Sequence, residues 1–189
     1  MARFEQALKT FPKITQAFDY LIEMDYTLFQ DLGEIAGDLL SDRERQFLAP
    51  ILSLLVLAFA PRGTCPPEID FADLSEAFRR ETAALDNLSN KRFEEQFEQW
   101  LVGSSQPQLL EVYLSLVVTL SDQAPPNIRP TNASRTSFFI ILRVVIDELD
   151  RAMRKAIKSV RLLTNAVVNR AVSRGADMEV ICGGFVCAV

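Results

Sequence analysis

The stretch that decides the fold is TSFFIILRVVIDELDRAMRKAIKSVRLLTNAVVNRAVSR, residues 136–174. It contains neither Pro nor Gly, and Ser134 or Thr136 can cap its start. Its apolar residues recur at steps of four and three, the 3.5-residue repeat of a helix that keeps one side against a partner helix. The repeat, named the seam from here on, consists of Leu142, Ile146, Leu149, Met153, Ala156, Val160, Leu163 and Val167. We predict one long helix.

This helix would be longer than the fold to which it belongs. At about 1.5 Å per residue it would measure about 58 Å, whereas a compact fold of 189 residues would be about 42 Å across. Residues 138–146 are apolar nearly all round, as in a buried helix, and from residue 151 onward the apolar side narrows. Either the helix bends near its middle, or its second half extends past the fold and needs a companion to cover it. We expect the first half to lie in the core and the second half to be a surface or overhanging helix.

The second half therefore supplies the predicted partner-binding residues, which are Met153, Val160, Leu163 and Val167.

The opposite side carries five basic residues within an arc of about 120°, and these are Arg151, Arg154, Lys155, Lys158 and Arg161. Asp147 and Asp150 precede two of them by four residues, a spacing that forms ion pairs on a helix. No aromatic residue lies among the five to stack on bases or to anchor in lipid. We expect a protein partner, most simply a second copy in a homodimer. Nucleic acid and an anionic membrane surface are weaker alternatives.

The charges are distributed unevenly along the chain, whose net charge is −5. Residues 1–134 carry 11 basic and 20 acidic side chains, whereas residues 135–174 carry nine basic and three acidic ones. The chain has no histidine, which excludes Ser-His-Asp and Cys-His nucleophile systems and His-ligated metals. Glu94 and Glu98 share a helical face that could hold Mg²⁺, but no second acidic helix or phosphate-binding glycine loop accompanies them. We expect a non-enzymatic protein without metal or cofactor; a carboxylate-dependent metalloenzyme stays open.

The whole chain reads as an all-α bundle of about six helices, with a single helical domain over residues 1–174. We predict one helix over residues 13–39, a capping box formed by Ser41 and Glu44, and a kink or restart at Pro50. Three segments are apolar all round and should form the centre of the bundle: 47–60, 109–120 and 138–146. The first of them is only 14 residues long, too short for the roughly 20 that span a membrane. Three irregularly spaced cysteines and the absence of a signal peptide indicate a cytoplasmic protein.

The C-terminal tail, residues 175–189, suggests a second function. It is apolar and β-prone, and its notable residues are Cys182, Gly183, Gly184 and Cys187. An apolar terminus left in water favours association, so it should be held somewhere. The alternative hypothesis is a helical carrier whose tail, residues 177–189, is modified, cleaved or presented to a partner.

Overall fold

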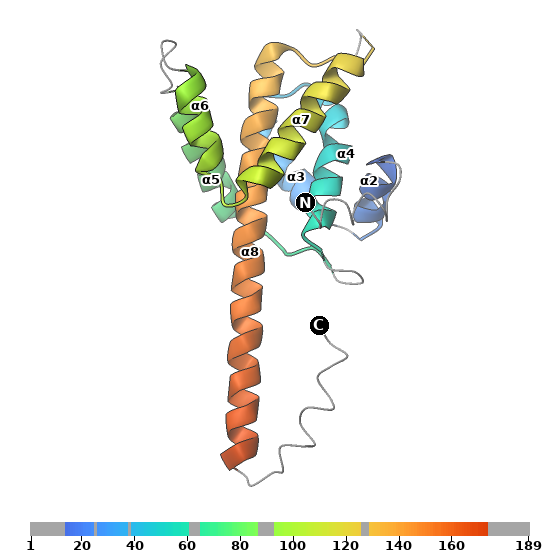
Figure 1. The fold of residues 1–189 in the computed structure, drawn as a ribbon. Helices are drawn as coiled ribbons and strands as arrows, with labels where there is room; N and C mark the ends of the chain where they lie inside the picture. Colours follow the sequence, from blue (N-terminus) through green and yellow to red (C-terminus); the bar gives the residue numbers. More distant parts are fainter. Residues whose placement is uncertain are drawn as a thin grey trace. The chain divides into compact units, whose positions relative to one another are not determined.

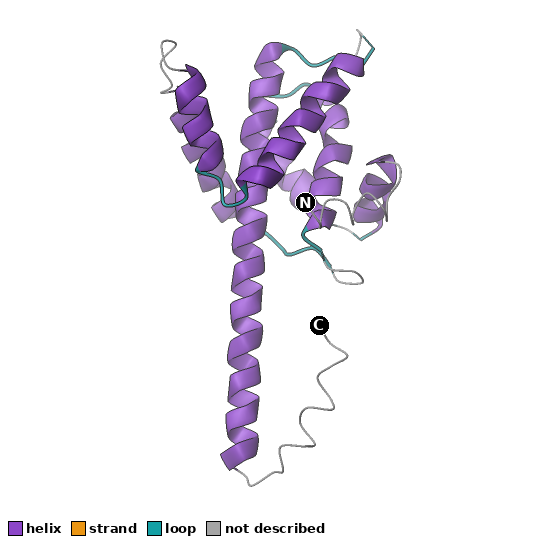
Figure 2. Ribbon diagram, viewed as in Figure 1, coloured by secondary structure: helices purple, strands orange, loops and turns teal. Residues whose placement is uncertain are grey.

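The computed structural model describes residues 14–24, 26–37, 39–60, 65–86, 93–125 and 129–173, which form helices and no strand (Figures 1 and 2). The seven helices of this part are α2 (Ile14–Glu23), α3 (Leu28–Ala36), α4 (Asp42–Ala58), α5 (Phe71–Asp86), α6 (Phe93–Val102), α7 (Pro107–Gln123) and α8 (Asn132–Ser173). The predicted all-helical fold with a long C-terminal helix is confirmed. Among the described residues, no helix combines the length and the apolar character needed to span a bilayer.

The chain divides into two units, residues 1–152 and residues 153–189, and the boundary lies inside α8. We refer to them as unit 1 and unit 2. The predicted domain boundary at residue 174 stays a prediction, because the residues after 173 lie outside the described part.

The core of unit 1 is built around α4 and residues 132–152 of α8. Every residue from Ile51 to Phe59 is buried, and so is every apolar residue of 140–149. The rings of Phe47 and Phe138 stack with their centroids 5.8 Å apart, which brings the two helices together. Figure 1 shows α7 beside them. Two of the three segments predicted to form the centre are therefore confirmed.

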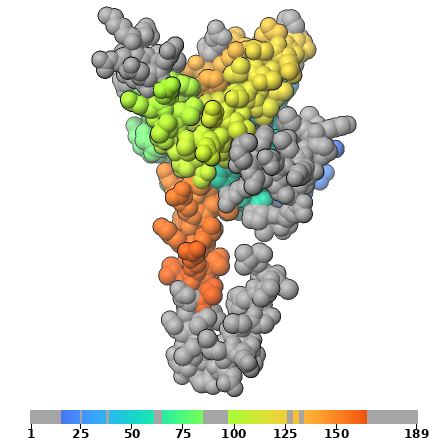
Figure 3. Space-filling model, viewed as in Figure 1, coloured from blue at the N-terminus to red at the C-terminus, as the bar shows by residue number. Residues whose placement is uncertain are grey.

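The third segment behaves differently, because α7 is buried on one face only. Leu110, Tyr113 and Val117 are fully buried, but Val118 is exposed. The outer face of α7, yellow in Figure 3, lies at the surface. The prediction that α7 is enclosed on all sides is wrong, because one side of this helix, with Glu111, Ser115, Val118 and Thr119, is exposed in the described part of the chain.

The single helix predicted over residues 13–39 is also wrong, because the chain turns between α2 and α3. In a continuous helix, Phe18 and Phe29 would lie about 16 Å apart along the axis. Their ring centroids are instead 5.4 Å apart, in an edge-to-face contact across the turn. The hydroxyl of Tyr26 donates to the carbonyl of Pro67 at 2.9 Å and fixes the turn against the loop before α5.

The start of α4 matches the predicted capping box. The amide of Glu44 donates to Ser41 Oγ at 3.4 Å, and the amide of Ser41 donates to the Glu44 carboxylate at 2.9 Å. The other Glu44 oxygen accepts a hydrogen bond from Ser134, in the first turn of α8. The cap therefore also joins α4 to α8. Farther along, α4 continues through Pro50 as one helix, without the predicted restart.

Candidate functional site

In unit 2, the described part of α8 carries apolar side chains that are exposed to solvent. Val160 is 58% exposed and Leu163 is 67% exposed, whereas Met153 is half-buried. Fully burying one such side chain contributes about 1.5–3 kcal/mol, so an exposed row of them favours association. Of the four predicted partner-binding residues, only Val167 has a side chain outside the described part.

The first three seam residues have a different environment. Leu142, Ile146 and Leu149 are completely buried in unit 1. They cannot reach a partner without opening the core, so the part of the seam from Met153 onward is the part that is left for association.

All five residues of the predicted basic face are exposed: Arg151, Arg154, Lys155, Lys158 and Arg161. Residues 153–173 contain five basic side chains and no acidic one.

Arg151 forms an ion pair with Glu148 at 2.7 Å. The predicted pair between Arg151 and Asp147 is therefore wrong. Asp147 instead accepts hydrogen bonds from Ser104 Oγ at 2.8 Å and from the Ser105 amide at 2.7 Å.

Two exposed apolar residues were missed by the seam pattern, and they lie on different sides of the helix. At 100° per residue, Ile157 lies 40° from Met153 and widens the seam. Leu162, which is 70% exposed, lies 180° from Met153, among the basic residues. Ile157 follows Ala156 and borders the seam, a signal visible in the sequence once the flanking positions are inspected.

The heptad register of the exposed seam shows which residues would meet a parallel partner. With Ile146 at position a, the later a positions are Met153, Val160 and Val167, and the d positions are Ala156 and Leu163. The flanking e and g positions of residues 152–166 hold Ala152, Ile157, Ser159, Thr164 and Ala166, none of which is charged. The basic residues occupy the outer b, c and f positions.

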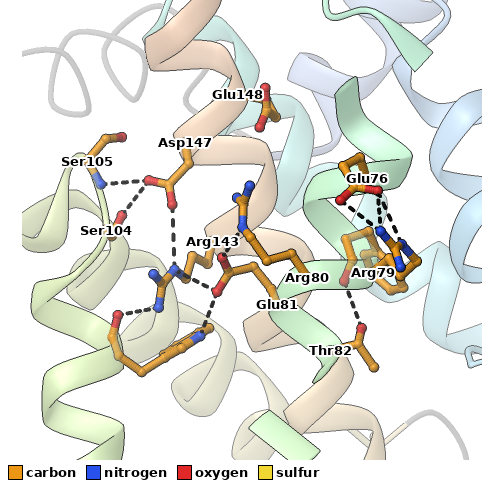
Figure 4. A network of polar contacts seen from close by, with 12 residues as sticks. Glu76, Arg79, Arg80, Glu81, Thr82, Ser104, Ser105, Arg143, Asp147 and Glu148 are labelled. Carbon is orange, nitrogen blue, oxygen red and sulfur yellow. Dashed lines mark hydrogen bonds and ion pairs between the residues drawn. The ribbon is translucent and has the colours of Figure 1, made fainter. Parts of the chain in front are cut away.

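Unit 1 contains a second cluster of interest, a buried polar network between α5, α6 and α8 (Figure 4). Arg143 Nε lies 3.2 Å from Glu81 Oε2 and 3.5 Å from Asp147 Oδ2, and the guanidinium also donates to the carbonyl of Trp100. Glu81 accepts a hydrogen bond from the indole of Trp100 at 3.0 Å. Arg80 Nε lies 3.3 Å from Glu81 Oε1, so two arginines balance the two carboxylates. The network therefore joins helices and leaves none of these four charges unpaired. Sequence analysis missed it because Glu81, Trp100 and Arg143 are 19 to 62 residues apart.

The metal site considered for Glu94 and Glu98 gains no support. Glu98 is exposed, and the side chain of Glu94 is outside the described part. Among the described residues there is no group of three or more Cys, Asp or Glu that could hold a metal ion. The tail residues Cys182, Gly183, Gly184 and Cys187 also lie outside the described part.

Comparison of the chain with protein-family models, with curated proteins and with solved structures finds no match. No relative therefore suggests a function. The exposed part of α8 is the surface from which a function can be argued.

Proposed function

We propose that this chain is a non-enzymatic protein-interaction module that forms a homodimer through the seam of α8 from Met153 to Val167. The observation that carries the proposal is the exposure of Val160 and Leu163, which continue the register of the buried Leu142, Ile146 and Leu149. The same heptad repeat therefore runs from the buried part of α8 into the part whose described side chains are exposed.

The residue types of the seam favour a second copy as the partner. Val160 and Val167 at positions a, with Leu163 at position d, are the combination preferred by parallel two-stranded coiled coils, whereas Met153 at a and Ala156 at d depart from it. The uncharged e and g positions place no like charges opposite each other when two copies pair. The basic residues lie on the outer side, where they remain in water. The seam and its flanks from residue 152 to residue 166 therefore place no charge between two copies.

The expected dimer is weak. Burial of Val160, Leu163 and Ile157 from each of two copies contributes about 9–18 kcal/mol gross. Association costs about 4–15 kcal/mol in lost translational and rotational freedom. The two ranges largely offset each other, so we expect the dissociation constant to lie between about 1 μM and 1 mM, where the binding free energy is about −8 to −4 kcal/mol.

Sedimentation equilibrium of the full chain, from about 1 to 200 μM, tests this proposal. The decisive variant is Leu163→Glu, and its matched control is Leu162→Glu, because the two leucines are neighbours with nearly equal exposure. We expect the wild type and Leu162→Glu to associate alike. Leu163→Glu should weaken the dimer at least about 100-fold, because two buried leucines are lost per dimer. A wild type that stays monomeric throughout, or two variants that behave alike, would refute the proposal.

Cross-linking tests the parallel arrangement. In a parallel dimer, position 160 of one copy lies opposite position 160 of the other. In a chain with Cys65, Cys182 and Cys187 replaced by serine, Val160→Cys should oxidise rapidly to a covalent dimer, whereas Leu162→Cys should not. Equal oxidation of both would contradict the assigned register.

A further inference from the structure

Unit 1 contains a second feature that the seam does not involve, an apolar cavity of about 280 Å³ that is partly open to solvent. Its wall includes Phe18 of α2, Phe29 and Leu32 of α3, Leu52 of α4 and Ile141 of α8. A space of this size and character is therefore a candidate for ligand binding.

Gly33 makes part of this space. A Cβ added to Gly33 would meet nothing within 4 Å, so this side of α3 faces open volume. Glycine in the middle of a helix destabilises it by about 0.5–1 kcal/mol relative to alanine. The chain therefore has a helix-weakening residue at the position where a side chain would project into the cavity.

Arg45 is the only cation among the described residues that line the cavity, and none of them is acidic. Its side chain is 41% exposed and pairs with Asp42 at 2.5 Å, and Arg45 Nη1 donates to the Gly37 carbonyl at 3.3 Å. Asp42 is 84% exposed, and such a surface pair contributes little. A second carboxylate can replace Asp42, since a guanidinium presents five N–H donors in a planar fork.

We infer that this cavity binds a small carboxylic acid, whose carboxylate pairs with Arg45 and whose hydrocarbon chain lies beside Gly33. A cavity of about 150 Å³ lined by Leu, Ile and Phe binds benzene. A volume nearly twice as large accommodates a hydrocarbon of about eight to ten carbon atoms. The site shares no residue with the seam from Met153 onward, so it is independent of the proposed dimer.

Calorimetric titration of the full chain at pH 7 with decanoate, below its micellar concentration, tests the inference. Decanol is the uncharged ligand of the same length. We expect saturable 1:1 binding of decanoate and at least about tenfold weaker binding of decanol, because a charge-assisted hydrogen bond is lost. Absence of saturable decanoate binding, or equal binding of decanol, would overturn the inference.

Three variants locate the ligand. Gly33→Leu should abolish decanoate binding by filling the cavity, and Arg45→Gln should remove the preference for decanoate over decanol. Arg79→Gln is the matched control, because Arg79 forms an equivalent i,i+3 pair with Glu76 on α5 and does not line the cavity. If Gly33→Leu does not fold by circular dichroism, Ala49→Leu fills the cavity from α4. Decanoate binding that survives in the folded filling variant, or a preference retained by Arg45→Gln, would show that the acid binds elsewhere.

Discussion

Arg143 Nε lies 3.2 Å from Glu81 Oε2, and both side chains are buried. Arg143 comes from α8 and Glu81 from α5, so one ion pair joins two helices that are far apart in the sequence (Figure 4). The Arg143 guanidinium carbon also lies 4.6 Å from the centroid of the Trp100 ring on α6, in a cation–π contact. Three helices therefore meet at one buried charge.

Replacement of Arg143 by methionine should destabilise unit 1 by about 3–5 kcal/mol, because Asp147 loses its cation and Glu81 keeps only the half-exposed Arg80, at 3.3 Å. The double variant Arg143→Met, Glu81→Gln should recover part of this loss, since the buried negative charge is removed as well. Urea denaturation measures both values. Arg79→Met is the control, because Arg79 is exposed on α5 and should change stability by less than about 0.5 kcal/mol. A double variant less stable than the single one would argue against an unpaired charge as the cause.

Glu148 should make stability depend on pH in a defined direction. Burial raises the pKa of its carboxyl above the ordinary value of 4.5, and this outweighs the lowering effect of Arg151. Oε1 of Glu148 has no hydrogen-bond partner in the described part of the chain. The folded state therefore holds the proton more tightly than the unfolded state. The contribution of Glu148 to stability is greatest below pH 4.5 and is lost as the pH rises through the raised pKa.

Glu148→Gln should accordingly be more stable than the wild type at pH 7, and this advantage should shrink toward pH 4. Thermal unfolding across that range is the measurement. Glu98→Gln, at an exposed position on α6, is the control for the removal of one negative charge. An advantage that stays constant with pH would mean that the carboxyl is not protonated on folding.

Glu44 should show the opposite dependence. Burial acts to raise the pKa of its carboxyl, but hydrogen bonds from Ser134 and Ser41 outweigh burial and lower the pKa below 4.5. The stability that these bonds contribute is present above pH 4.5 and is lost as the pH falls through the lowered pKa. Ser134→Ala should therefore cost about 1.5–3 kcal/mol at pH 7, the range for a hydrogen bond to a charged group. The cost should be smaller near pH 3.

The control for Ser134→Ala is Ser159→Ala, whose hydroxyl donates to the Lys155 carbonyl within α8 and touches no titratable group. Its effect, measured by the same unfolding curves, should be independent of pH. If Ser134→Ala behaves in the same way, the hydrogen bond to Glu44 does not control stability.

The features that sequence predicts well here are local ones. The capping box at Ser41 and the long helix α8 depend on residues within one or two turns of each other, so their spacing is visible in the chain itself. The seam rests on the same kind of short-range spacing, but its role as a binding surface stays a prediction. Its predicted residues Val160 and Leu163 are exposed in the structure, although what they bind stays a proposal.

The features that sequence missed depend on distant partners. The turn between α2 and α3 is fixed by the bond from Tyr26 to Pro67, 41 residues away. Asp147 accepts hydrogen bonds from Ser104 and Ser105 of the α6–α7 connection. The sequence instead predicts an ion pair with Arg151, four residues further along the same helix. Helical periodicity shows on which face of a helix a residue lies. It does not show which of several tertiary partners will bind a carboxylate such as that of Asp147.

Replacement by alanine should change stability in opposite directions at Gly33, inside α3, and at Gly37, the C-terminal cap of α3. Gly33→Ala should stabilise the fold by about 0.5–1 kcal/mol, because the helix gains propensity and the new Cβ meets nothing within 4 Å. A Cβ on Gly37 would lie 2.5 Å from the Gly33 carbonyl oxygen, so Gly37→Ala should destabilise by about 1–3 kcal/mol. At about 2–4 °C per kcal/mol for a chain of this size, melting temperatures distinguish the two. Shifts of the same sign would contradict the geometry at one of these positions.

Substitutions at a buried and at an exposed seam residue should affect the free energy of unfolding and the self-association separately. Leu149 is fully buried in unit 1, so Leu149→Ala should cost about 2–5 kcal/mol of unfolding free energy at any protein concentration. Leu163 is 67% exposed, so Leu163→Ala should change stability by less than about 0.5 kcal/mol at submicromolar concentration. At about 100 μM the same variant should lose the concentration-dependent rise in melting temperature expected for a dimer, because binding stabilises only the folded state. A melting temperature of the wild type that does not rise with concentration would leave the exposed seam without a role in self-association, even if Leu149→Ala behaves as expected.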